Sequence, residues 1–226
     1  MLVAHVRAET RFLGGAGGDK KIINLNKQVN SGGYQLMMVQ TVTKTYSFED
    51  YLNYRDDSDF KYELLNGELI QMTPASGWHS DIIDFIQEQF KIEIRRLNLN
   101  WVVRPGTVGV RTGIRKSRIP DILVMTETQR QLLRTLPSAI LEEPPLLVVE
   151  IVSPNNPEDD YRYKRSEYAA LGIPEYWIID SQESKISILS LVSGFYDIVE
   201  YRGEDIINSA SFPELKLTAE QILNAL

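Results

Sequence analysis

Apolar residues recur at helical spacing in the stretch that begins at Ser80. Charged residues occupy the other faces of this stretch, so it predicts the longest amphipathic helix of the chain. The apolar positions are Ile82, Ile86, Phe90, Ile94 and Leu97. A shorter helix is predicted after Ser47, because Ser47 and Asp50 have the spacing of a capping box.

Short apolar runs between glycines and prolines predict a series of strands. Asn66-Gly67 stands between two apolar-rich arms, which predicts a hairpin with a type I′ turn. Strands are predicted in WVVRPG, TVGVRTG, DILVMT, LLVVEIV, EYWIID, KISILSL and YDIVEYR. Helices are predicted after Pro157, ending near Gly172, and in LTAEQILNAL. This order of elements predicts an α/β or mixed α+β fold with a mixed sheet.

Residues 1–37 differ from the rest of the chain. They hold six of the 14 glycines and show no sustained periodicity, so we expect a disordered tail. Met37 and Met38 directly precede the first predicted elements, and we hypothesise that the natural start lies there. N-terminal sequencing of the native protein would reject this hypothesis if it found the peptide before Met37. Residues 38–226 are expected to form a single domain.

The composition argues against several classes of protein. The chain has no cysteine and cannot form disulfides or thiolate metal sites, which suits a reducing cytoplasm. No apolar run approaches the ~18 residues of a membrane helix, and the first residues lack the pattern of a signal peptide. We therefore expect a cytoplasmic protein without a membrane partner.

The charge argues against a general affinity for nucleic acid. The net charge is −7, and the residues after the tail carry 19 basic and 29 acidic side chains. One segment, RPGTVGVRTGIRKSRIPD, is basic instead and has no acid before Asp121. Its basic residues are Arg104, Arg111, Arg115, Lys116 and Arg118. Charge alone favours a solvated hairpin here, and contact with phosphate groups is the alternative.

Glu150 is a carboxylate within an aliphatic run, LLVVEIV, that should be buried on both faces. An ionised carboxylate there costs several kcal/mol unless a cation or hydrogen-bond donors meet it. Asp121 opens the apolar strand ILVM, and antiparallel pairing of the two strands would bring Asp121 and Glu150 to one edge of the sheet. Two such carboxylates suit Mg²⁺ or Mn²⁺. The alternative is that Asp121 caps a turn and Glu150 pairs with an arginine.

Lys164 supplies a third feature of this candidate site. Asp160, Lys164 and Tyr168 follow one another at four-residue spacing on the helix predicted after Pro157, so they share a face. That face should pack on the sheet, where Lys164 would reach the same carboxylates. A lysine that extends its ammonium group to solvent is the alternative.

These residues resemble a known family of nucleases. Pro120-Asp121, an apolar strand and Glu150 in VVEIVSP resemble the PD-(D/E)XK nuclease core. The blocks YELLNGEL, TPASGWHS, RIPDILV, LLVVEIVSPNN and DYRYKRSEYAALGIPEYWIID resemble the Uma-type branch of restriction-endonuclease-like proteins, long catalogued as a domain of unknown function. The resemblance runs from about Tyr46 to the C-terminus. It implies a central mixed β-sheet flanked by helices, with the site at its edge.

The resemblance also implies roles for individual residues. Asp121 and Glu150 would bind Mg²⁺ or Mn²⁺ together with the backbone carbonyl of Ile151. The family core expects a lysine two residues after the acid, but Val152 stands there. Lys164 is the candidate for the missing charge.

Two further residues lie in blocks that match the family. Glu63 and His79 would act as a further ligand or proton carrier. A purely structural role is the alternative for Glu63, and a cap or surface histidine is the alternative for His79.

The resemblance favours a metal-dependent endonuclease that hydrolyses DNA, with the basic segment holding the phosphate backbone beside the site. A catalytically inactive nuclease fold that binds nucleic acid or protein is the first alternative, and Val152 favours it. A two-carboxylate glycosidase is the second, and it would leave Lys164 without a role. Strands KISILSL and YDIVEYR would offer an edge for a homodimer.

Overall fold

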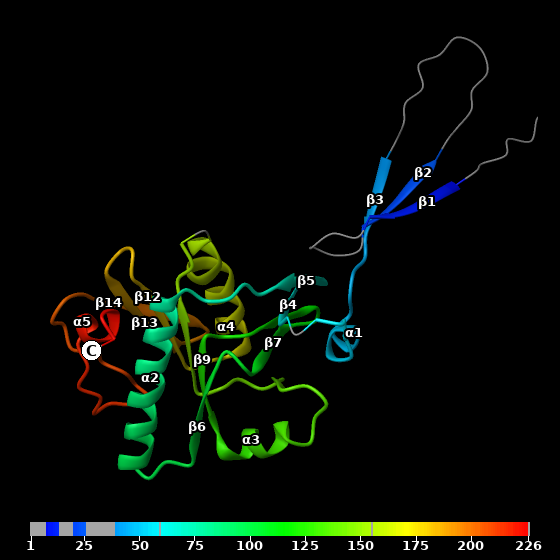
Figure 1. Cartoon of the computed structure of the whole chain (residues 1–226). Helices are drawn as coiled ribbons and strands as arrows, with labels where there is room; N and C mark the ends of the chain where they lie inside the picture. Colours follow the sequence, from blue (N-terminus) through cyan, green and yellow to red (C-terminus); the bar gives the residue numbers. More distant parts are fainter. Residues whose placement is uncertain (1–7, 14–19, 26–38, 59, 155, 226) are drawn as a thin grey trace, which may run out of the picture.

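The computed structural model describes residues 8–13, 20–25, 39–58, 60–154 and 156–225, and side-chain environments from Lys44 onward within these ranges. Two mixed sheets hold most of the strands, and a smaller sheet lies away from them near the N-terminus (Figure 1). The fold is therefore mixed α+β, as predicted. No helix in the described ranges is both long and apolar enough to cross a membrane.

The larger sheet contains the strands that the apolar runs predicted. Its order is β14-β13-β12-β11-β9-β6. The bounds are β6 Trp101–Pro105, β9 Ile122–Thr126, β11 Leu147–Ile151, β12 Glu175–Asp180, β13 Lys185–Val192 and β14 Phe195–Tyr201. β11 pairs antiparallel with β9 and parallel with β12, which makes this sheet mixed. β14 lies at an edge, and the homodimer expected from such an edge stays a prediction.

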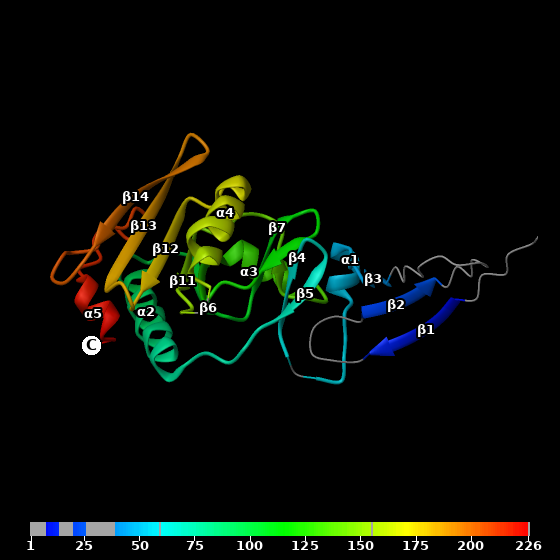
Figure 2. The same cartoon turned by 90° about the horizontal axis from the view of Figure 1, so that it is seen from above.

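Helices cover both faces of this sheet (Figure 2). α2 (Gly77–Arg96) packs its apolar face against Leu147 and Val149 of β11. The alternate residue Val148 packs on the other face, with Tyr168 of α4 (Arg165–Leu171). Successive side chains of a strand point to opposite faces, so β11 is buried on both.

The second sheet has the order β10-β7-β8-β4-β5. The bounds are β4 Tyr62–Leu65, β5 Glu68–Gln71, β7 Gly109–Gly113, β8 Lys116–Arg118 and β10 Ile140–Leu141. Asn66 and Gly67 join β4 to β5 with φ values of 52° and 89°, which are the positive angles that a type I′ turn requires. α1 (Phe48–Leu52), α3 (Glu127–Leu133) and α5 (Ala219–Leu223) complete the helices, and Ser47 and Asp50 form the predicted capping box of α1.

The helix predicted after Pro157 is present, but it begins with wider turns than an α-helix. Asp159–Lys164 form a π-helical segment, η1, and α4 follows directly. α4 ends at Gly172, whose φ of 89° is the left-handed conformation that favours glycine. The sequence did not predict η1, and π-helical turns occur frequently at functional sites.

The third sheet contains β1 (Ala8–Leu13), β2 (Lys20–Leu25) and β3 (Val39–Thr43), paired antiparallel. The expectation of a disordered tail missed β1 and β2. The other residues of 1–37 lie outside the described ranges. The hypothesis of a natural start near Met37 stays a prediction.

Candidate functional site

Asp121 and Glu150 lie at the same edge of the large sheet. β9 and β11 pair with Ile122 opposite Val149, so Asp121 and Glu150 are the next positions along each strand. The backbone amide of Ile151 donates a hydrogen bond to Asp121 Oδ2 at 2.7 Å, which fixes the orientation of the Asp121 carboxylate. The predicted convergence of these two residues is therefore present.

Lys164 reaches Glu150 from the end of η1. Its Nζ atom lies 2.8 Å from Glu150 Oε2 and 2.8 Å from Asp160 Oδ1. Burial would lower the pKa of Lys164, but the carboxylates of Glu150 and Asp160 outweigh it and raise the pKa well above its usual value. Lys164 therefore stays charged, and the alternative in which it extends to solvent is wrong.

Tyr168 provides a second contact to Glu150. Its hydroxyl donates a hydrogen bond to Glu150 Oε1 at 2.5 Å. Both oxygens of Glu150 thus have a partner, which explains how a side chain with 2% exposure is tolerated in the core. Burial raises the pKa of Glu150 to about 8, against the opposing effect of Lys164. Burial also raises the pKa of Tyr168 well above its usual value, so its hydroxyl remains a donor.

His79 lies against the other carboxylate of the site. It occupies the first turns of α2, where the Ser76 hydroxyl accepts a hydrogen bond from the His79 amide. His79 Nε2 lies 3.0 Å from Asp121 Oδ1, yet this buried atom has no hydrogen-bond partner, because the contact is close but poorly oriented. His79 is therefore no surface histidine.

The chemistry of these donors fits a divalent metal ion. Asp121 and Glu150 supply carboxylate oxygens and His79 an unpaired nitrogen, a combination that suits Mn²⁺ or Mg²⁺. Across the described part of the chain, no three His, Asp or Glu side chains already stand as a group that could hold a metal. Glu150 is instead held by Lys164 and Tyr168. The metal-binding role expected of the Ile151 carbonyl stays a prediction.

Arg118 is buried among three carboxylates beside this site. Its guanidinium group lies 3.0 Å from Glu63, 3.1 Å from Asp159 and 2.9 Å from Glu167. With 1% of its surface exposed, Arg118 cannot contact a phosphate backbone, so its predicted role in binding nucleic acid is wrong. Its three partners tie β4, η1 and α4 to β8.

Glu63 is part of the same network. Its Oε2 atom binds Arg118, and its Oε1 atom accepts a hydrogen bond from the Ile119 amide at 2.8 Å. Both oxygens are therefore already engaged. This geometry supports the structural alternative for Glu63, and its role as a ligand or proton carrier stays a prediction.

Comparison with known proteins assigns the chain to a family. Residues 48–220 match the family model described as "Uma2: Putative restriction endonuclease". The chain belongs to the Uma2 family. No curated protein matches the chain.

A solved structure has the same fold as this Uma2 protein. It is described as a "putative nuclease belonging to DUF820" from Anabaena variabilis ATCC 29413. The TM-score is 0.66 with 18% identity, and the match covers 79% of this chain and 98% of that chain. The predicted restriction-endonuclease-like fold is confirmed.

The basic segment of the Uma2 protein does not form one free cationic surface. Arg111 contacts Glu142 at 2.5 Å and lies over the ring of Phe48, and Lys116 contacts Glu167 at 3.1 Å. Arg115 donates to the carbonyl of Tyr46 at 3.1 Å. Arg104 is half-buried and has no acidic partner among the residues that the structure describes. The contribution of these four residues to DNA binding stays a prediction.

Sequence reasoning missed the parts of the site that depend on burial. Asp160 holds Lys164 from within η1, and the hydroxyl group of Tyr168 binds Glu150. The four-residue spacing of Asp160, Lys164 and Tyr168 was the available signal. It indicated a shared face but not which atoms would meet.

Proposed function

We propose that this Uma2 protein is a Mg²⁺- or Mn²⁺-dependent endonuclease that hydrolyses phosphodiester bonds of DNA. One observation carries the proposal: β9, β11 and η1 bring Asp121, Glu150 and Lys164 to one edge of a sheet. This is the acid, acid and lysine combination of the PD-(D/E)XK core, with the lysine supplied from a helix. The family and the fold support a nuclease of the restriction-endonuclease type.

Asp121 and Glu150 would hold the ion, and His79 would stand beside Asp121. A divalent ion bound there would polarise the scissile phosphate and lower the pKa of an attacking water. Lys164 would place its positive charge next to the phosphate, where charge accumulates during hydrolysis. Asp160 and Tyr168 act as positioning residues, because they hold Lys164 and Glu150 respectively.

The test combines metal binding with cleavage. Mn²⁺ and Mg²⁺ are titrated calorimetrically into the full chain and into Asp121→Ala and Glu150→Gln, and each protein is assayed on plasmid and single-stranded DNA. Both variants should lose metal binding and at least about a hundredfold of cleavage. Glu88→Ala is the control, since this acid is exposed and contacts only the exposed Arg95 on α2, away from the site. Unchanged cleavage in either site variant would refute the proposal.

The second candidate is an inactive nuclease fold that binds nucleic acid. The ion pair between Lys164 and Glu150 favours it, because the pair neutralises the acid without any metal. On this alternative neither ion binds the wild type, no DNA is cleaved, and Asp121→Ala binds DNA as the wild type does.

A further inference from the structure

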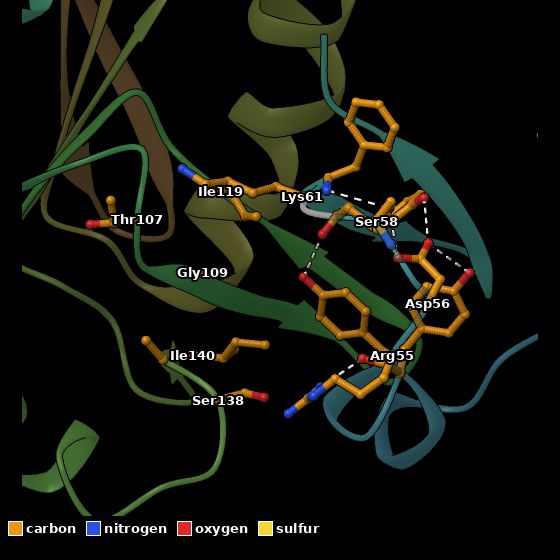
Figure 3. Close-up of a pocket in the computed structure, with 14 residues that line it drawn as sticks. Arg55, Asp56, Ser58, Lys61, Thr107, Gly109, Ile119, Ser138 and Ile140 are labelled. Carbon is orange, nitrogen blue, oxygen red and sulfur yellow. Dashed lines mark hydrogen bonds between the residues drawn. The ribbon is translucent and has the colours of Figure 1, made fainter. Parts of the chain in front are cut away.

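A cavity of about 320 Å³ opens between α1 and β4 on one side and β7 and β10 on the other (Figure 3). This volume is at the low end of the range for small-molecule sites, about 300–1,000 Å³. None of the residues in its wall belongs to the acid and lysine site. The cavity is therefore separate from that site.

Aromatic side chains form much of the wall. The rings of Tyr54 and Tyr62 meet edge to face, with centroids 5.4 Å apart. Both hydroxyl groups donate to Asp56 Oδ2, at 3.3 and 2.7 Å. Tyr51 donates to the carbonyl of Tyr62 at 2.7 Å. These bonds hold the rings in place before any ligand arrives.

Phe60 completes the wall and is 55% exposed. An exposed ring at the mouth of a cavity offers a flat apolar surface to a planar ligand. Every nucleobase has such a face, and stacking of bases on aromatic side chains tolerates all sequences. The wall therefore suits a planar base.

The charged residues at the cavity suit a ligand that carries phosphate groups. Arg55 and Lys61 lie in the wall, and Asp56 is the acid there. Asp56 is already engaged by hydroxyl donors, including Ser58 at 2.6 Å. Lys61 extends along the surface and donates to the carbonyl of Gly106 at 2.6 Å. Cations beside aromatic side chains are typical of sites that bind single-stranded nucleic acid, and this cavity has both.

The cavity adjoins the acid and lysine site through the chain itself. The amide of Gly106 donates to the backbone carbonyl of Asp121 at 2.8 Å, and Lys61 contacts the same Gly106. Ile119, two residues before Asp121, also lines the cavity. A strand whose phosphate lies at Asp121 would therefore have a neighbouring base within reach of this wall.

We propose that the cavity walled by Tyr54, Phe60 and Tyr62 binds an unpaired nucleobase of the strand that reaches Asp121. The inference rests on the proposed function for the identity of the ligand. A base inside a duplex is stacked and paired on both sides, so it cannot enter without leaving the stack. The protein should therefore prefer single-stranded or locally unpaired DNA.

The experiment measures binding without cleavage. A short single-stranded oligonucleotide with one internal 2-aminopurine, and the same oligonucleotide annealed to its complement, are titrated in EDTA with the full chain. Anisotropy of a terminal dye reports affinity, and quenching of 2-aminopurine reports stacking. The variants are Phe60→Ala, which removes one exposed ring, and Thr107→Met, which fills part of the cavity with an aliphatic side chain from an exposed position. Phe195→Ala is the control, since Phe195 is 78% exposed on β14 of the other sheet.

The wild type should bind the single strand more tightly than the duplex and quench the probe. Phe60→Ala and Thr107→Met should each weaken single-strand binding about tenfold and reduce quenching, while Phe195→Ala changes neither. Equal affinity and quenching in all four proteins would overturn the inference, as would equal binding of single strand and duplex by the wild type. Asp121→Ala should still quench the probe. The cleavage of DNA by Asp121→Ala therefore tests the proposed function, while the quenching tests the base-binding cavity.

Discussion

Lys164 Nζ and Glu150 Oε2 lie 2.8 Å apart although they belong to a helical segment and to the central strand of a sheet. The position two residues after Glu150, where the family core expects a lysine, is filled by Val152, which is buried in the core beneath α4. Lys164 thus supplies the positive charge next to Glu150, while Val152 keeps an apolar side chain in the core. The consequences of this arrangement can be measured.

Replacing Lys164 by methionine should destabilise the protein and abolish cleavage. The change leaves Glu150 buried without its cation, and removing one partner of a buried pair typically costs about 3–5 kcal/mol. Urea unfolding above pH 8, where Glu150 is ionised in the folded protein, measures the loss. The double variant Lys164→Met/Glu150→Gln should recover much of the stability but none of the cleavage. If the single and double variants are equally unstable, the two side chains are not coupled as the distance indicates.

Tyr168→Phe should test the positioning of Glu150. It removes the hydroxyl that donates to Glu150 Oε1 but keeps the ring in the core. We expect a loss of about 1–3 kcal/mol of stability, because a buried acceptor loses its donor. Weaker binding of Mn²⁺ in calorimetry would identify a positioning role. Tyr196→Phe, which loses a hydroxyl bonded to the Ile173 carbonyl, is the matched control and should leave Mn²⁺ binding unchanged.

Arg118 and Arg104 should behave in opposite ways. Arg118→Met leaves three carboxylates without their shared cation, so the protein should lose about 3–5 kcal/mol of stability. Arg104→Ala should leave stability nearly unchanged and weaken DNA binding. The slope of the logarithm of the binding constant against the logarithm of the salt concentration should fall by about 1, as expected for the loss of one phosphate contact. Unfolding curves and DNA titrations at several salt concentrations separate the two effects. A stable Arg118→Met protein with weakened DNA binding would contradict the structural role.

The stability of the metal-free protein should fall as the pH rises towards 8. The pKa of Glu150 is raised to about 8 by burial, while an unfolded glutamate has a pKa of about 4.3. The folded protein therefore keeps a proton that the unfolded chain releases between these values. This contribution to stability is complete below the unfolded pKa and is lost as the pH approaches about 8.

Glu150→Gln should remove this dependence. Urea unfolding from pH 4 to 9 in EDTA should show the wild type losing on the order of a few kcal/mol relative to Glu150→Gln. Parallel curves for the two proteins would show that Glu150 is ionised in the folded protein across this pH range. The ion pair with Lys164 would then be strong enough to offset the burial of Glu150.

The sequence predicted the contacts that depend on regular periodicity. Antiparallel pairing of the apolar runs ILVM and LLVVEIV placed Asp121 and Glu150 at one edge, because it brings the start of one strand beside the end of the other. The four-residue spacing placed Lys164 and Tyr168 on one helix face. Asn66-Gly67 predicted its hairpin because few residues accept positive φ at both positions.

The remaining features depend on partners that are distant in sequence. In the sequence, Arg118 is one of several basic residues in a predicted hairpin. In the structure it is buried because it binds acidic side chains that are 41 to 55 residues away in the chain. The π-helical turn has no comparable sequence signal, since it depends on how α4 packs on the sheet. β1 and β2 were missed because glycine-rich stretches separate them. Long-range packing, rather than local preference, decides the burial of Arg118 and the π-helical turn.

The separation of Lys164 from the strand of Glu150 also bears on how related proteins are recognised. A search pattern that requires acid and lysine two residues apart would pass over this chain, whose ammonium group nevertheless reaches the same acid from position 164. A structural search for two acids at one sheet edge, with a lysine or arginine in contact with the second acid, would find this chain. Position 152 can then hold an apolar residue while position 164 supplies the positive charge.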